Sequence, residues 1–167
     1  MVRIHRLSYF LAVPFFLISL SFSPPDVSAE TSKIFKTSYC DICYSDDKAL
    51  SDFFWRISGK RFSFTEDISL ARSRVDRLID RVQSILDMYP DNLHVKIDLF
   101  PEYKKGLIAK YKYRVNTVTV YADKVTDGIL AHEFAHAVIC NYFDTPPPAK
   151  MQEILARYVD KYLWSDY

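Results

Sequence analysis

The stretch Ile129–Cys140 limits the fold of this chain more than any other part of the sequence. Its clearly polar residues are His132, Glu133 and His136, and its other side chains are apolar. A helix that is apolar on all sides is buried, so we expect this stretch to form a central helix covered by other elements. Burying two imidazoles and a carboxylate costs free energy unless a partner satisfies them, and a divalent cation is such a partner.

The spacing of these three polar residues is that of a metal site. His132 and His136 are four residues apart, so both share one helix face and can offer ring nitrogens to one ion. Glu133 lies one step round the helix, where it can reach a water on the ion without being a ligand itself. This His-Glu-x-x-His arrangement is typical of zinc-dependent peptidases.

A catalytic zinc site needs a third protein ligand, and Glu153 is the best candidate. Cys140 is excluded, because three ligands at successive four-residue steps span about 12 Å of helix and cannot converge on one ion. His94 is expected on the polar face of a distant strand. Glu153 follows His136 by 17 residues, far enough for the chain to turn at Pro146–Pro148 and return as an antiparallel helix.

With these residues the chain resembles the gluzincins, the thermolysin-like branch of the zincin metallopeptidases. The resemblance covers about residues 125–160, with Glu153 on the helix after the motif and the small Ala156 three residues later. It implies one Zn²⁺ held by His132, His136 and Glu153, with Glu133 as general base in peptide-bond hydrolysis.

The chain also departs from these relatives in three ways. Ile154 stands where many of them have glycine, and Arg157 replaces an aspartate that supports a metal-binding histidine in thermolysin-like enzymes. Asp160 is the nearest acid on the same helix face. We also find no segment for the second lobe that supplies a transition-state histidine or tyrosine in larger members, and neither Tyr142 nor Tyr158 is singled out by its spacing.

Composition limits the other function classes. The 167 residues carry 22 basic and 21 acidic side chains, so the basic excess of an electrostatic nucleic-acid binder is missing. There are only three glycines, and they are scattered, so no glycine-rich phosphate loop is present. We therefore expect a peptide or protein substrate and no nucleic-acid partner, and the oligomeric state stays open.

The N-terminus has the three-part pattern of a secretory signal peptide. Arg3 and Arg6 precede an apolar run over Leu7–Phe22, and small residues follow at Val27–Ala29. We expect residues 1–29 to be a signal peptide and residues 30–167 a single zincin-like metallopeptidase domain, secreted or periplasmic, with no stable membrane span after cleavage. An uncleaved anchor is the alternative, although the run is short for one.

Export makes the three cysteines candidates for a disulfide. Cys40 and Cys43 have the spacing of a redox motif, but the surrounding sequence does not predict the strand-to-helix turn that such a motif needs. We expect a structural disulfide, either within this pair or from one of them to Cys140. A thiol–disulfide protein using Cys40 and Cys43 is a minor alternative.

Periodicity predicts an α+β fold: a single zincin-like lobe with a small mixed sheet packed on helices, the buried metal-binding helix among them. Helices are expected over 48–57 and, after a Thr65 cap, up to Pro90. Strands are expected over 33–44, 93–99, 108–115 and 117–121.

The strand expected over 108–115 carries Lys110, Lys112 and Arg114 on one face and Tyr111 and Tyr113 on the other. This basic row favours a charged edge strand that resists unwanted pairing, and a contact for an acidic ligand is the alternative. Since an edge strand beside the metal helix binds extended peptides in the zincins, the resemblance makes this strand the candidate substrate-binding edge.

The sequence therefore predicts a secreted zinc metallopeptidase. An alternative from another class is a zincin-fold binding or assembly factor of the cell envelope, which keeps its metal but has little turnover. Retention of Glu133 disfavours this alternative, because a purely structural metal site needs no base.

Overall fold

The computed structural model describes residues 32–59 and 68–165, which form an α+β domain with a five-stranded mixed sheet. The signal peptide expected over 1–29 and the Thr65 cap lie outside these residues. In chain order the elements are β1 (Lys33–Lys36), β2 (Cys40–Tyr44), α1 (Asp47–Ile57), α2 (Ile68–Leu86), β3 (Val95–Phe100), β4 (Ala109–Lys112), a 3₁₀ turn (Tyr113–Val115), β5 (Thr117–Tyr121), α3 (Asp127–Tyr142) and α4 (Ala149–Tyr162).

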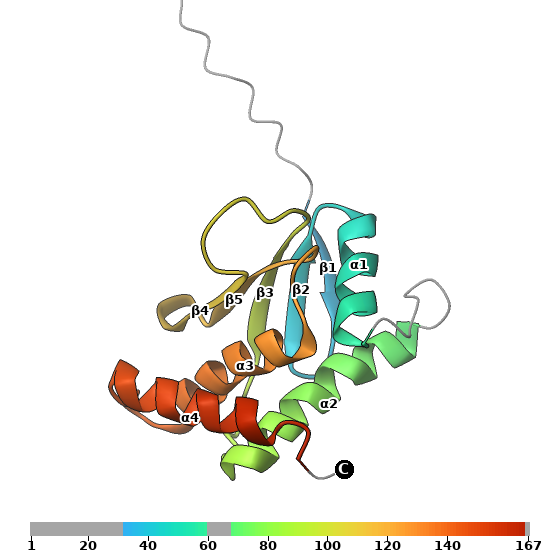
Figure 1. The fold of residues 1–167 in the computed structure, drawn as a ribbon. Coiled ribbons are helices and arrows are strands. Elements are labelled where there is room, and N and C mark those ends of the chain that lie inside the picture. Colours follow the sequence, from blue (N-terminus) through green and yellow to red (C-terminus); the bar gives the residue numbers. More distant parts are fainter. Residues whose placement is uncertain (1–31, 60–67, 166–167) are drawn as a thin grey trace, which may run out of the picture.

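The sheet has the strand order β1-β2-β3-β5-β4. The central pairs β2–β3 and β3–β5 are parallel, and the outer pairs β1–β2 and β4–β5 are antiparallel. Burial alternates along β3, where Val95, Ile97 and Leu99 are buried and the residues between them are not. The helices thus cover one face of the sheet (Figure 1), and β4 is left as an edge strand, as predicted.

The helix α3 lies at the centre of the packing, as its composition predicts. It contacts α4 and α2 on one side and the edge strand β4 on another. Thr126 caps its first turn by accepting a hydrogen bond from the backbone N–H of Ile129 at 3.3 Å. Half of its residues are buried: Leu130, Ala131, Phe134, Ala135, Ala137, Val138, Ile139 and Cys140.

Two strand predictions need correction. The single strand expected over 33–44 is a hairpin, because Thr37 closes a turn: its hydroxyl accepts from the backbone N–H groups of Tyr39 and Cys40. The strand expected over 108–115 ends at Lys112, so Arg114 is not part of the basic row. The 3₁₀ turn follows, and Asn116 reverses the chain in the left-handed conformation with φ of 44°.

The predicted disulfide is wrong, because Cys40, Cys43 and Cys140 are all free thiols. Cys40 and Cys43 stand three residues apart in the extended strand β2, so about 10 Å separates their Cα atoms. A disulfide tolerates at most about 7 Å. Burial also raises the pKa of both thiols, the opposite of what a redox-active pair requires.

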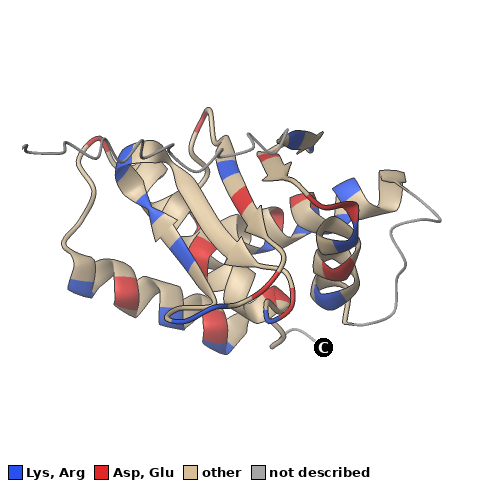
Figure 2. Ribbon diagram, turned by 90° about the horizontal axis from the view of Figure 1, so that it is seen from above, with Lys and Arg blue, Asp and Glu red and all other residues tan. Residues whose placement is uncertain are grey.

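Among residues 32–59 and 68–165, no helix has the length and apolar character needed to cross a membrane. In the view of Figure 2, Lys and Arg alternate with Asp and Glu along the helices and strands.

Candidate metal centre

Two antiparallel helices build the candidate metal centre. The chain leaves α3 at Tyr142, turns through residues 143–148 and returns as α4 against α3. The antiparallel register is visible in two contacts: Gln152 meets Cys140 near the end of α3, and Asp160 meets His132 a few turns earlier. Glu153 therefore faces the histidine pair, as the sequence predicts.

The three predicted ligands converge. The Nε2 atoms of His132 and His136 lie 3.7 Å and 3.8 Å from the same Oε2 atom of Glu153. All three ligand atoms lie within 4.8 Å of one another, which allows the group to hold a metal ion. His94 is excluded as predicted, since it pairs with Asp41 on the sheet at 3.4 Å.

Each ligand is held by a neighbour outside the ligand set. Asp160 Oδ2 lies 2.9 Å from Nδ1 of His132, which fixes the ring with Nε2 toward the site. Burial lowers the pKa of the His136 imidazole, and a hydrogen bond with the side chain of Gln152 offsets only part of that lowering. Arg157 donates from Nε to Oε1 of Glu153 at 2.9 Å, which leaves Oε2 to face the histidines.

The charge states of the ligands suit a cation. Burial lowers the pKa of His136, which favours the neutral imidazole that binds metals. The hydrogen bond from Arg157 is the main reason that the pKa of Glu153 is lowered, so the carboxylate is ionised. The site thus offers two histidine nitrogens and one anionic oxygen.

Glu133 is not part of the ligand group and points to the edge strand. Its Oε2 atom accepts a hydrogen bond from the backbone N–H of Tyr111 at 2.6 Å. The backbone carbonyl of Ile108 accepts a hydrogen bond from the N–H of Tyr121 in β5. In an antiparallel pair every second residue bonds to the neighbouring strand, so the backbone groups of Ala109 and Tyr111 point away from β5, to the outer edge of β4. The carboxylate of Glu133 therefore lies between α3 and the outer edge of β4.

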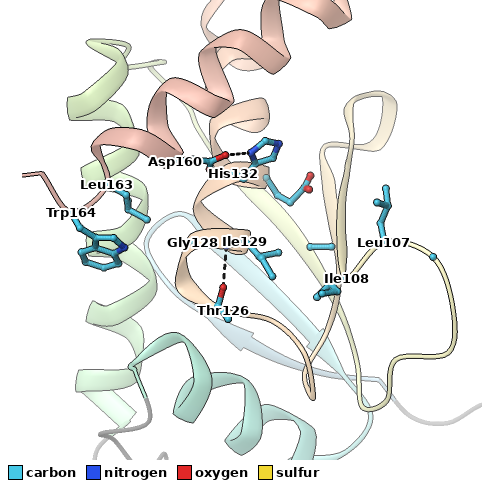
Figure 3. A pocket seen from close by; sticks show the side chains of 12 residues that line it. Leu107, Ile108, Thr126, Gly128, Ile129, His132, Asp160, Leu163 and Trp164 are labelled. Atoms are coloured by element: carbon cyan, nitrogen blue, oxygen red, sulfur yellow. Dashed lines mark hydrogen bonds and ion pairs between the residues drawn. The ribbon is translucent and has the colours of Figure 1, made fainter.

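A cavity of about 600 Å³ adjoins His132 and Glu133. Leu107 and Ile108 line it on the β4 side and Leu163 and Trp164 on the α4 side, with Ile129 between them (Figure 3). His132, Glu133 and Asp160 supply its charged or ionisable groups, so the rest of the wall is apolar or neutral. The cavity can accept an apolar side chain directly beside the metal site.

The sequence predicts the three residues that converge but not the groups that support them. The sequence indicates Asp160 only as the nearest acid on its helix face, seven residues after Glu153 and two turns along the same face. The roles of Gln152 and of the Tyr111 N–H leave no signal in the sequence. Tyr158 is not a site residue, because it points outward and stacks on Tyr162 with ring centres 4.5 Å apart.

The contact between Asp160 and His132 gives the first prediction. Asp160→Asn should weaken zinc binding by about 10- to 100-fold, because it removes the charge that orients and polarises the imidazole. Competition against a zinc chelator measures the change. Asp144→Asn, at an exposed position in the turn between α3 and α4, is the matched control and should bind zinc like the wild type. Equal affinity of both variants would contradict the role of Asp160.

Comparisons of the chain with protein-family models, curated proteins and solved structures found no match.

Proposed function

We propose that the protein is an extracytoplasmic zinc-dependent peptidase with a single zincin-like lobe. The convergence of His132, His136 and Glu153 at one point, with Glu133 beside them, is the observation that carries this proposal. Glu133 lies on the same helix as the two histidines and accepts a hydrogen bond from the Tyr111 N–H at the outer edge of β4. A metal site of purely structural kind would be closed by a fourth protein ligand, whereas a catalytic zinc site has three.

The donor set fits zinc. Two histidine nitrogens and one carboxylate oxygen are the ligands of several catalytic zinc sites, with bonds of about 2.0–2.2 Å. Tetrahedral geometry at that bond length places ligand atoms about 3.4 Å apart. The observed distances of 3.7 Å and 3.8 Å between Glu153 Oε2 and the histidine nitrogens need only a small contraction.

In this proposal a bound zinc ion supplies Lewis acidity toward water and the scissile carbonyl. Glu133 accepts the proton of the attacking water and passes it to the leaving amine. The backbone N–H of Tyr111 holds Oε2 of Glu133 and so fixes the carboxylate, and no described residue hydrogen-bonds to Oε1. Asp160 and Arg157 keep His132 and Glu153 aimed at the ion.

The substrate would lie along the free edge of β4 as an added strand. The helix α3 runs in the same direction as β4. The start of α3 lies beside Leu107, just before β4, because both line the cavity. Near the end of α3, Asn141 donates a hydrogen bond to Asn116, which follows β4. A peptide antiparallel to β4 therefore directs its leaving-amine side toward the cavity. We expect an apolar residue directly after the cleaved bond.

A binding or assembly factor is the second candidate. The hydrogen bond from Tyr111 to Glu133 favours it, because this bond uses one carboxylate oxygen and ties the base to the strand edge that a substrate would approach. In such a protein the metal would stiffen the contact between α3 and α4, and turnover would be small.

Cleavage of a broad peptide library, read by mass spectrometry, tests the proposal. Zinc-loaded protein should produce new amino termini enriched in apolar residues. A chelator should abolish cleavage, and added Zn²⁺ should restore it, because the three ligands hold the ion that the reaction requires. Zinc-loaded protein that cleaves nothing would favour the binding factor.

A further inference from the structure

The outward face of α4 is an exposed apolar surface that the metal site does not use. Met151, Ile154 and Tyr158 are 51%, 59% and 48% exposed, although each is a large hydrophobic residue. Their spacing places them on one stripe of the helix, opposite the buried Ala156. In Figure 1, α4 lies on the outside of the molecule in front of α3.

Positive charge borders this stripe and negative charge is absent from it. Lys150, Arg157 and Lys161 lie along one side of the stripe, by their helical positions. The acids of α4 are Glu153 and Asp160, which both contact His132. Glu153 also pairs with Arg157 at 2.9 Å, so Lys150 and Lys161 are the cations that remain beside the stripe. The bands of both signs on α4 are visible along the lower edge of Figure 2.

We propose that the outward face of α4 binds the surface of an anionic lipid bilayer. A helix with an apolar stripe and flanking Lys and Arg residues lies in the plane of the membrane interface, with the stripe among the acyl chains and the cations at the headgroups. Tyrosine suits this position because its ring is apolar and its hydroxyl is polar. Lys161 lies 5.0 Å from the ring centre of Tyr162, which places a cation at this boundary.

Charge disfavours a second copy of the chain as the occupant. A two-fold contact between outward α4 faces would set the cations of one copy against those of the other. The acids of α4 do not offset Lys150 and Lys161, because Glu153 and Asp160 contact His132 and Glu153 is also paired with Arg157. The anionic headgroups of a bilayer supply negative charge for the cations that border the stripe.

This surface is independent of the proposed hydrolysis. Glu153, the proposed ligand on α4, points to α3, so contact through the opposite side of α4 leaves the metal site and the outer edge of β4 uncovered. A peptidase docked in this way would act on substrates held near the membrane surface.

Sedimentation of the full chain with lipid vesicles tests the proposal. Vesicles of phosphatidylcholine mixed with phosphatidylglycerol are compared with phosphatidylcholine alone. The double variant Ile154→Ser/Tyr158→Ser should partition at least about tenfold less onto the mixed vesicles. Lys150→Gln/Lys161→Gln should lose up to about 30-fold, since each cation near an anionic surface contributes about fivefold.

The matched control is Ile34→Ser/Tyr89→Ser, which removes an isoleucine and a tyrosine that are 54% and 58% exposed elsewhere on the molecule. It should partition like the wild type. Residues 1–31 are identical in all four proteins, so their own affinity for lipid cancels in the comparison. Circular dichroism and zinc content should be the same in all four.

Several results would overturn the proposal. Equal partitioning of the wild type and both α4 variants would show that this face does not touch the membrane. Equal binding to the two kinds of vesicle would rule out the role of anionic headgroups. An Ile154→Ser/Tyr158→Ser variant that changes a dimer to a monomer in light scattering, with vesicle binding unchanged, would assign the face to a second copy.

Discussion

Glu133→Gln should lower peptide hydrolysis by about 10²- to 10⁴-fold while zinc content and stability stay near those of the wild type. Glutamine keeps the length of the side chain and its carbonyl oxygen can still accept the hydrogen bond from the Tyr111 N–H. It cannot take up the proton of the attacking water. Rates of peptide cleavage and metal analysis of the same preparation measure the two effects separately.

Glu102→Gln makes the matched control, because it changes an exposed glutamate away from the metal site. This variant should retain full activity. Loss of zinc from Glu133→Gln would mean that Glu133 is a ligand and not a base. A zinc-loaded wild type without cleavage, together with a Glu133→Gln variant that keeps its biological role, would decide for the binding factor.

The helix α3 could be predicted because the sequence features that define it are local. Residues four apart in a helix share a face whatever surrounds them, so the sequence alone places His132 and His136 together. The burial of α3 is also predictable from its sequence alone, since a helix that is apolar on nearly all sides is stable only in the interior of a small domain. To place Glu153, one must also predict that the chain returns antiparallel after Pro146–Pro148. The structure confirms that Glu153 meets His132 and His136.

The supporting contacts could not be predicted because they depend on how elements dock. Asp160 reaches His132 only at one register of α4 against α3, and the turn over 143–148 sets that register. The bond from Tyr111 to Glu133 depends on the position of a sheet edge relative to a helix. No residue pattern within either element encodes such distances.

The strand errors have a different origin. Both errors occur where a single polar residue forms a turn within a segment whose other residues favour a strand. Thr37 ends β1 through its hydroxyl, and Asn116 reverses the chain after β4. The disulfide error is of another kind: Cys40 and Cys43 lie in one extended strand, the conformation expected for this segment, and their Cα atoms are too far apart there for a disulfide.

Glu153→Ala should reduce zinc affinity by at least about 10²-fold, a larger loss than expected for Asp160→Asn, because it removes a ligand and not a group behind a ligand. Activity should fall with zinc occupancy, whereas Glu133→Gln loses activity alone. Zinc at 100 times its Kd stabilises a folded protein by about 2.7 kcal/mol, so added Zn²⁺ should raise the Tm of the wild type. This rise should vanish in Glu153→Ala.

Arg157→Ala separates the ligand from its neighbour on the same helix. It removes the partner of Glu153 Oε1 but leaves Oε2 facing the histidines. Because the Arg157 side chain is 74% exposed, its ion pair is worth at most about 1 kcal/mol, or roughly fivefold in zinc affinity. A Glu153→Ala variant that binds zinc as well as Arg157→Ala does would show that Glu153 is not a ligand, since loss of a direct metal bond cannot cost as little as loss of an exposed ion pair.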